Sequence, residues 1–199
     1  MLRLLGWIFG FGMFAALAGI GVAAVYLTNI AAGLPDYTVL KDYQPPVTTR
    51  VHAADGTLLA EFARERRLFQ PVETVPPLLV HAFLSAEDKD FYSHGGIAID
   101  GVFRAVRDNV LARLDGNTAI QGGGSSITQQ VAKNFLLTSE QTWDRKLQEA
   151  LLAIRIESTF SKDRILELYL NEIFLGLNSY GVAAAALNYF DKALYQLTL

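Results

Sequence analysis

A run of 24 residues without a charged side chain, Leu4 to Leu27, constrains this chain most. In a helix that rises about 1.5 Å per residue, the run would extend roughly 36 Å and could cross a bilayer with some tilt. A cleaved signal peptide is the alternative, but its apolar region usually has only about 7–15 residues. Arg3 is the only basic residue before the run and Lys41 is the next one, so the positive-inside rule favours a cytoplasmic N-terminus. The sequence therefore predicts one membrane anchor, with the remainder of the chain outside the inner membrane.

The composition of the whole chain excludes several classes of protein. Hydrophobic residues make up 51% of the 199 residues, which excludes a disordered chain. Because cysteine is absent, disulfide scaffolds, thiolate zinc sites, iron–sulfur clusters and cysteine nucleophiles are excluded as well. A formal net charge of −3 argues against nucleic acid as a partner.

The residues after the apolar run divide into a connector and one domain. Residues 28–46 contain one glycine and three prolines, which is typical of a linker. Two alternating runs around Asp55-Gly56 predict a β-hairpin, and from Pro76 onward the pattern is almost entirely helical. We therefore expect an anchor over residues 1–30, a linker over 31–47 and a mainly α-helical domain over 48–199.

The first helical segment carries an acidic residue in an apolar stripe. A helix that starts between Thr74 and Pro77 and runs through Tyr92 would place Glu87 on one face with Val80, Phe83, Leu84 and Phe91. Partial desolvation of this carboxylate would favour its neutral form, which is how enzymes commonly tune a glutamate that acts as a general base. The alternative is an acidic helix end, formed by Glu87, Asp88 and Asp90, that water solvates.

A glycine-rich loop leads into the next helix. Gly122 to Gly124 precede Ser126 and Gln129, whose spacing is that of a capping box, so the helix is expected to start there and continue through Phe135. Such a loop presents backbone N–H groups to a phosphate or pyrophosphate, and Lys133 could add a positive charge. A flexible loop before a capped helix is the alternative, and the missing Gly-Lys-Ser/Thr excludes a Walker loop.

Two further amphipathic helices follow in the sequence. The core face of the first is predicted from its apolar residues at helical spacing, Trp143, Leu147, Leu151 and Ile154. Arg145 and Glu149 lie one turn apart on another face, and an exposed pair of this kind needs no functional explanation. Residues 162–171 predict a helix that serves mainly for packing. The three histidines, His52, His81 and His94, are too scattered for a helix-based metal site.

Five blocks, in this order, resemble the motifs of the glycosyltransferase domain of class A penicillin-binding proteins and of the monofunctional peptidoglycan glycosyltransferases. The first block is Glu87-Asp88-x-x-Phe91-x-x-His94-x-Gly96, and the second is Gly123-Gly124-Ser125-Ser126-Ile127-Thr128-Gln129-Gln130 with Lys133-Asn134. The remaining blocks are Arg145-Lys146-x-x-Glu149, Ile165-Leu166-Glu167-x-Tyr169-Leu170-Asn171 and Tyr180-Gly181-Val182-x-Ala184-Ala185.

The resemblance implies a lysozyme-like, mainly α fold with a small N-terminal β-hairpin and one transmembrane helix. It also implies an enzyme of bacterial cell-wall synthesis, a peptidoglycan glycosyltransferase that polymerises lipid II on the periplasmic, outer face of the inner membrane. Glu87 would be the general base that takes the proton from the 4-hydroxyl of the acceptor sugar. Undecaprenyl pyrophosphate would leave, and the configuration would invert to a β-1,4 link.

The resemblance further assigns the other site residues. Glu149 would be a second catalytic glutamate that organises the pyrophosphate, either with the nearby cations or through a divalent cation, Mg²⁺ or Mn²⁺, near Glu149 or Asp88; no cofactor is certain. The implied substrate-binding residues are Asp88, Phe91, His94, Gly124, Ser125, Ser126, Thr128, Gln129, Gln130, Lys133, Asn134, Arg145, Lys146 and Arg155. The implied partners are lipid II, the growing glycan strand and the lipid bilayer, with other cell-wall synthesis proteins as further candidates.

Two features depart from the family's pattern. Ala98 stands where relatives usually carry Asp, two residues after the motif glycine, and Asp100 is displaced from that place. The chain ends at Leu199, where relatives continue, and no Ser-x-x-Lys of a transpeptidase domain is found, so we expect an N-terminal fragment with an incomplete glycosyltransferase domain. The competing hypotheses are a non-catalytic, membrane-anchored scaffold and a lysozyme-like glycan hydrolase. We also expect an apolar, membrane-proximal patch between Gly101 and Leu137.

Overall fold

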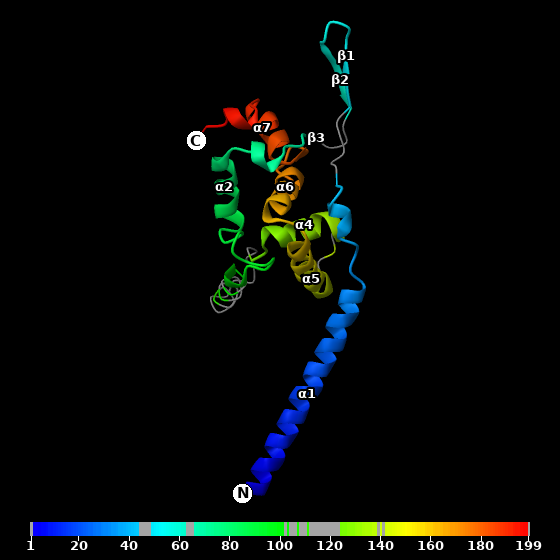
Figure 1. Cartoon of the computed structure of the whole chain (residues 1–199), viewed down its shortest axis with the longest axis vertical. Helices are drawn as coiled ribbons and strands as arrows, with labels where there is room; N and C mark the ends of the chain where they lie inside the picture. The colour runs from blue at the N-terminus through cyan, green and yellow to red at the C-terminus, as the bar shows by residue number, and fades with distance from the viewer. Residues whose placement is uncertain are drawn as a thin grey trace.

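A long N-terminal helix projects from a mostly helical body in the computed structural model (Figure 1). The structure describes residues 2–43, 49–62, 66–101, 103, 107, 111, 124–138, 140 and 142–198. Helix α1 (Leu2–Ala32) contains a stretch from Phe9 to Ala32 that is long and apolar enough to cross a membrane, with a mean hydropathy of 1.9. The side chains of α1 that the structure describes are almost all exposed, which is consistent with the expected membrane anchor.

Three helices that pack against one another form the centre of the body. Helix α4 (Ile127–Leu136) contacts both α5 (Trp143–Thr159) and α6 (Lys162–Glu172). Helices α2 (Pro77–Glu87) and α7 (Val182–Phe190) flank them (Figure 1). The short 3-10 helices η2 (Val72–Thr74) and η3 (Leu194–Gln196) precede α2 and follow α7. The core consists of apolar side chains from these helices and the loop after α2, including Phe91, Ile127, Leu152, Ile156, Ile165, Leu166 and Leu170. The expected mainly α-helical domain is confirmed.

The expected hairpin is also present. Strand β1 (Thr49–His52) pairs antiparallel with β2 (Leu58–Phe62), with Thr49 opposite Phe62. At the turn, Gly56 has a φ of +85°, a left-handed conformation that glycine adopts without strain. A second small sheet pairs β3 (Arg66–Arg67) in parallel with β4 (Ser179–Tyr180), and it joins the chain after the hairpin to the start of α7.

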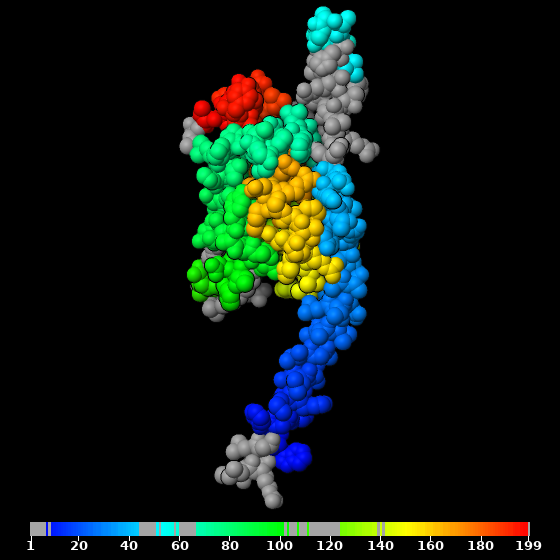
Figure 2. Space-filling model, in the orientation of Figure 1, coloured from blue at the N-terminus to red at the C-terminus, as the bar shows by residue number. Residues whose placement is uncertain are grey.

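The segment that the sequence identifies as a connector packs against the body where the structure describes it. It contains the turn η1 (Thr38–Leu40), and Leu40 is fully buried in the core. Arg164 of α6 donates a hydrogen bond of 3.0 Å to the carbonyl oxygen of Leu40, and the Tyr43 hydroxyl donates one of 3.0 Å to Glu172. Figure 2 shows this light-blue segment against the yellow and orange surface of α5 and α6.

Two helices differ from the sequence expectation. Helix α2 ends at Glu87 and does not continue through Tyr92, because Asp88 leaves the helical conformation with φ −160° and ψ 75°. In α5 the predicted core face is wrong. Trp143 is 87% exposed and Ile154 is 48% exposed, whereas the buried side chains are Glu149, Leu152, Ala153 and Ile156. Helix α5 is rotated about its axis relative to the predicted orientation, because the Glu149 carboxylate lies on its buried face.

The expected membrane-proximal patch falls largely outside the described residues. Phe103 and Leu111 are exposed apolar side chains in this part of the chain. Most of residues 102–123 lie outside the described ranges, so the patch as a whole stays a prediction.

Candidate active site

A polar cleft of about 500 Å³ lies where the end of α2 meets the start of α4 and the first turns of α5. All but one of its lining residues carry a polar or charged side chain: the lining consists of Ala86, Glu87, Ser125, Gln129, Gln130, Lys133, Arg145, Lys146 and Glu149. Residues from three of the five sequence blocks therefore meet in one cavity, although up to 62 positions separate them in the chain.

Glu87 is the last residue of α2 and faces this cleft. Its side chain is exposed, so the expectation that it is held away from water is wrong. Since the helix stops at Glu87, the carboxylate lies at the rim of the apolar stripe and is not covered by Phe91. Its Oε2 accepts a hydrogen bond of 2.9 Å from Nε2 of Gln130 on α4. The carboxylate is thus close to the segment that follows the glycine-rich loop and open to a ligand.

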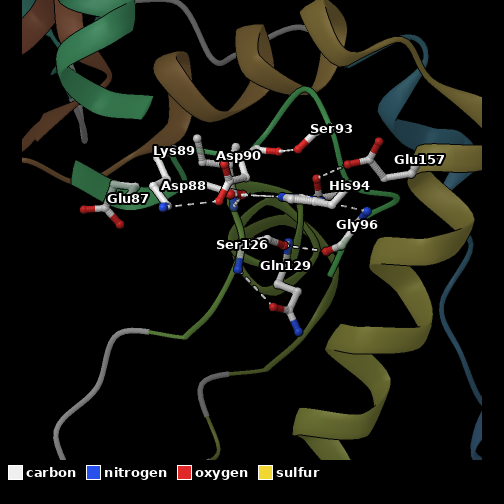
Figure 3. Close-up of polar contacts among 12 residues, drawn as sticks. Glu87, Asp88, Lys89, Asp90, Ser93, His94, Gly96, Ser126, Gln129 and Glu157 are labelled. Carbon is white, nitrogen blue, oxygen red and sulfur yellow. Dashed lines mark hydrogen bonds and ion pairs between the residues drawn. The ribbon is translucent and has the colours of Figure 1, made fainter. Parts of the chain in front are cut away.

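Asp88, the next residue, points the other way and is only 5% exposed. Its Oδ2 lies 2.9 Å from Nε2 of His94 and accepts a hydrogen bond of 3.0 Å from the backbone N–H of Ile127 (Figure 3). The backbone N–H of Gly96 donates to Nδ1 of His94 at 3.1 Å, so the histidine carries its proton on Nε2 and donates it to Asp88. Asp88 thereby fixes the end of α2 against the start of α4.

The capping box at the start of α4 is confirmed. The Ser126 Oγ accepts from the backbone N–H of Gln129 at 3.1 Å, and the Gln129 Oε1 accepts from the backbone N–H of Ser126 at 2.9 Å. With Asp88 bound to Ile127, the backbone N–H groups of Ser126, Ile127 and Gln129 all have partners inside the protein. The start of α4 therefore binds the Asp88 carboxylate. One of the two interpretations of the sequence placed a phosphate at this position.

A tight approach of the backbone positions the loop that carries His94. Gly96 has a φ of +99°, and a Cβ at this position would lie 2.7 Å from the carbonyl oxygen of Ala153 on α5. Its own carbonyl oxygen accepts a hydrogen bond from Ser126. Nearby, Thr128 donates to Glu157 at 2.6 Å, and Lys162 donates to both Glu157 and the His94 carbonyl at 2.7 Å. This buried polar network connects α4, α5 and α6 behind the cleft.

Cationic side chains line the same cleft as Glu87. Glu149 is only 2% exposed and pairs with Arg145 and Lys146, with 2.6 Å between Oε2 and the Lys146 Nζ. Lys146 also donates to Ser125 at 2.7 Å, and Lys133 enters the same cavity from α4. The Arg145–Glu149 pair, which the sequence suggested was merely exposed, is therefore a buried part of the site. Three cations against two carboxylates make the lining net positive and suited to an anionic ligand.

The donor set does not fit a divalent cation at either expected position. Both oxygens of Glu149 are paired with cationic side chains, and those of Asp88 face His94 and the Ile127 N–H. Among the residues that the structure describes, no group of three or more His, Asp or Glu side chains could hold a metal ion. The cationic side chains are the charge-neutralising groups of this cleft.

The structure separates the predicted site residues into four sets. Eight of them line the cleft: Glu87, Ser125, Gln129, Gln130, Lys133, Arg145, Lys146 and Glu149. Five lie behind it as buried or partly buried supports: Asp88, Phe91, His94, Ser126 and Thr128. Gly124 lines a neighbouring cavity of about 110 Å³. Asn134 and Arg155 are not among the lining residues of either cavity, and Arg155 instead donates to the Ala31 carbonyl at the end of α1.

The neighbouring cavity contains residues that the sequence analysis did not assign to the site. It shares Glu87 with the cleft and is also lined by Ser85, Lys89, Asp90, Ala98 and Gly101. Ala98, at the position where the resemblance implies Asp, therefore lines the same cavity as Glu87. The small side chain leaves this cavity without the extra negative charge that the resemblance would place there.

The comparisons with known proteins agree with the geometry. A family model described as Transglycosylase matches residues 55–199. The penicillin-binding protein 1A of Rickettsia conorii is 46% identical over 187 residues, which cover 94% of this chain and 23% of that protein. Those of Neisseria cinerea and Neisseria meningitidis serogroup A are 44% and 43% identical over 96% and 98% of this chain, and each is covered to 23%.

The chain thus spans about a quarter of the length of these relatives. The family match includes the hairpin turn, the cleft and all helices from α2 onward. Together with the mainly helical body, it confirms the expected lysozyme-like glycosyltransferase fold. The chain belongs to the transglycosylase family.

Proposed function

We propose that this chain is a peptidoglycan glycosyltransferase that polymerises lipid II into glycan strands. The observation that carries the proposal is the position of Glu87, an exposed carboxylate that lines one cleft together with Lys133, Arg145 and Lys146. A base and a cationic pocket within one cavity are the two elements that transfer of a sugar from a pyrophosphate requires.

The proposed reaction follows from these positions. Glu87 takes the proton of the acceptor's 4-hydroxyl while that oxygen attacks the anomeric carbon of the donor sugar. The bond between the anomeric carbon and the pyrophosphate oxygen breaks on the opposite face, so the configuration inverts. Lys133, Arg145 and Lys146 stabilise the negative charge that develops on the leaving pyrophosphate. Glu149 keeps Arg145 and Lys146 in place and takes no proton.

The apolar helix α1 supports a reaction at a membrane surface. We propose that α1 spans the inner membrane once, with its N-terminus in the cytoplasm and the cleft on the periplasmic face. The Tyr26 hydroxyl bonds to Asp144, and Arg155 donates to the Ala31 carbonyl at 3.3 Å, so α5 is held close to the end of the span. Enzyme and polyprenyl substrate would then share one surface, which raises their effective concentration. Other cell-wall synthesis proteins are candidate partners of the whole protein.

The proposal is tested with lipid II in vesicles that contain the full chain. We expect the wild type to consume lipid II and release undecaprenyl pyrophosphate, and Glu87→Gln to lose at least about 100-fold in rate because the base is missing. Glu73→Gln, an exposed position on η2, is the control and should leave the rate unchanged. Shortening of preformed glycan by the wild type would instead indicate a hydrolase. No action on either substrate would favour the scaffold.

A further inference from the structure

Tyr169 on α6 carries a buried hydroxyl group. The residue is 1% exposed, and among the described residues its hydroxyl oxygen has no hydrogen-bond partner. Buried hydroxyl groups in native proteins are nearly always paired, since an unpaired one loses its bonds to water without replacement. The tyrosine belongs to the fourth sequence block, to which the sequence analysis gave only a packing role.

The Tyr169 ring packs against the C-terminal half of α2. The ring of Tyr169 packs edge-on against Phe83, with 6.1 Å between the ring centroids and 77° between the ring planes. Phe83 and Glu87 are four residues apart and share one face of α2, so Glu87 is the next side chain of that face along the helix. Burial, and secondly the negative charge of Glu87, raise the pKa of Tyr169, so its hydroxyl stays protonated and can donate.

We infer that Tyr169 is a positioning residue for Glu87, whose carboxylate accepts a hydrogen bond from the tyrosine hydroxyl when the side chain turns toward the core. The inference rests on the proposed function. Gln130 already donates to Oε2 from the cleft side, and Tyr169 would donate to Oε1 from the core side. No proton is transferred in this contact. The two donors would hold the carboxylate in one orientation and leave its remaining lone pairs for the acceptor's hydroxyl.

The kinetic test is Tyr169→Phe in the membrane-anchored chain, which removes the hydroxyl and keeps the ring. We expect kcat to fall about tenfold and KM for lipid II to change less than about twofold, because the hydroxyl acts on the base and not on the substrate. Tm should change little, because the substitution removes a buried polar group together with its hydrogen bond. Tyr92→Phe is the matched control, because the Tyr92 hydroxyl bonds to Asp163 at 3.1 Å and neither residue lines the cleft. A kcat within twofold of the wild type, or a parallel loss of kcat and Tm, would overturn the inference.

A second measurement does not depend on activity. Tyr169→Phe is made in the wild type and in Glu87→Ala, and Tm is measured for all four proteins. If Glu87 is the partner of the hydroxyl, the Tm change caused by Tyr169→Phe should be about 2 °C more positive in the Glu87→Ala background than in the wild type. The reason is that the hydroxyl has no Glu87 carboxylate to bond in that background. Equal shifts in both backgrounds would contradict the contact. A wild type that fails to use lipid II would contradict the proposed function. The four Tm values would still show whether the Tyr169 hydroxyl contacts Glu87.

Discussion

Gln130 donates a hydrogen bond of 2.9 Å from Nε2 to Oε2 of Glu87, and it is a direct side-chain link between the helices that face each other across the cleft. Glu87 ends α2, whereas Gln130 lies in the first turns of α4. The exposed carboxylate is therefore oriented by a neighbour on α4 and not by burial. A base held in this way stays accessible to an acceptor sugar.

Replacing Gln130 by Ala should lower the single-turnover rate of glycosyl transfer about tenfold. The reason is that a hydrogen bond to a charged group contributes about 1.5 kcal/mol at the lower end of its range, and this one restricts Glu87 to one orientation. Gln148→Ala is the control, because Gln148 lies on α5 and lines neither cavity. A rate for Gln130→Ala equal to that of the control would show that the bond does not orient the base.

Asp88→Ala should lower the free energy of unfolding by about 3 kcal/mol. The substitution leaves two buried donors without an acceptor, the His94 ring N–H and the Ile127 backbone N–H. Asp90→Ala is the control. Asp90 forms an exposed pair with Lys89 at 3.8 Å, which contributes less than about 1 kcal/mol. Urea unfolding of the two variants measures both values, and similar losses would argue against a supporting role for Asp88.

The sequence predicted the local features of the fold well, because neighbouring residues determine them. The hairpin turn at Gly56 and the capping box of Ser126 and Gln129 each depend on residues within a few positions of one another. The anchor helix depends only on a continuous apolar run. In these three cases the pattern and the structure agree.

The sequence failed where contacts between distant residues decide the outcome. Helix α2 stops at Glu87 because the next carboxylate is drawn to the Ile127 N–H, 39 positions away. Helix α5 turns a glutamate inward because Arg145 and Lys146 pair with it in the cleft. The connector packs against the body because Arg164 binds its carbonyl oxygens, 121 to 124 positions distant. No local periodicity carries such information.

The stability of the wild type should fall as the pH rises above about 10, and Tyr169→Phe should make this fall less steep. Burial and the charge of Glu87 raise the pKa of Tyr169 above its ordinary value of 10.0 in the folded state. In the unfolded state the tyrosine ionises near 10.0, so alkaline pH favours unfolding until the folded pKa is passed; below that range the contribution is constant. Urea unfolding between pH 9 and 11.5 checks this, and identical slopes for the two proteins would contradict it.

Gly96→Ala should lower the free energy of unfolding by about 2–3 kcal/mol, whereas Gly95→Ala should change it by less than about 0.5 kcal/mol. The φ of +99° at Gly96 disfavours any residue with a side chain, and the added Cβ would lie 2.7 Å from the Ala153 carbonyl oxygen. At Gly95 a Cβ would meet no atom within 4 Å. Both variants have the same composition and alter the same loop, so only the local backbone and the close approach to α5 differ. Equal losses in urea unfolding would mean that the loop moves away from α5 at little cost, and the positions assigned to His94 and Asp88 would then not depend on this glycine.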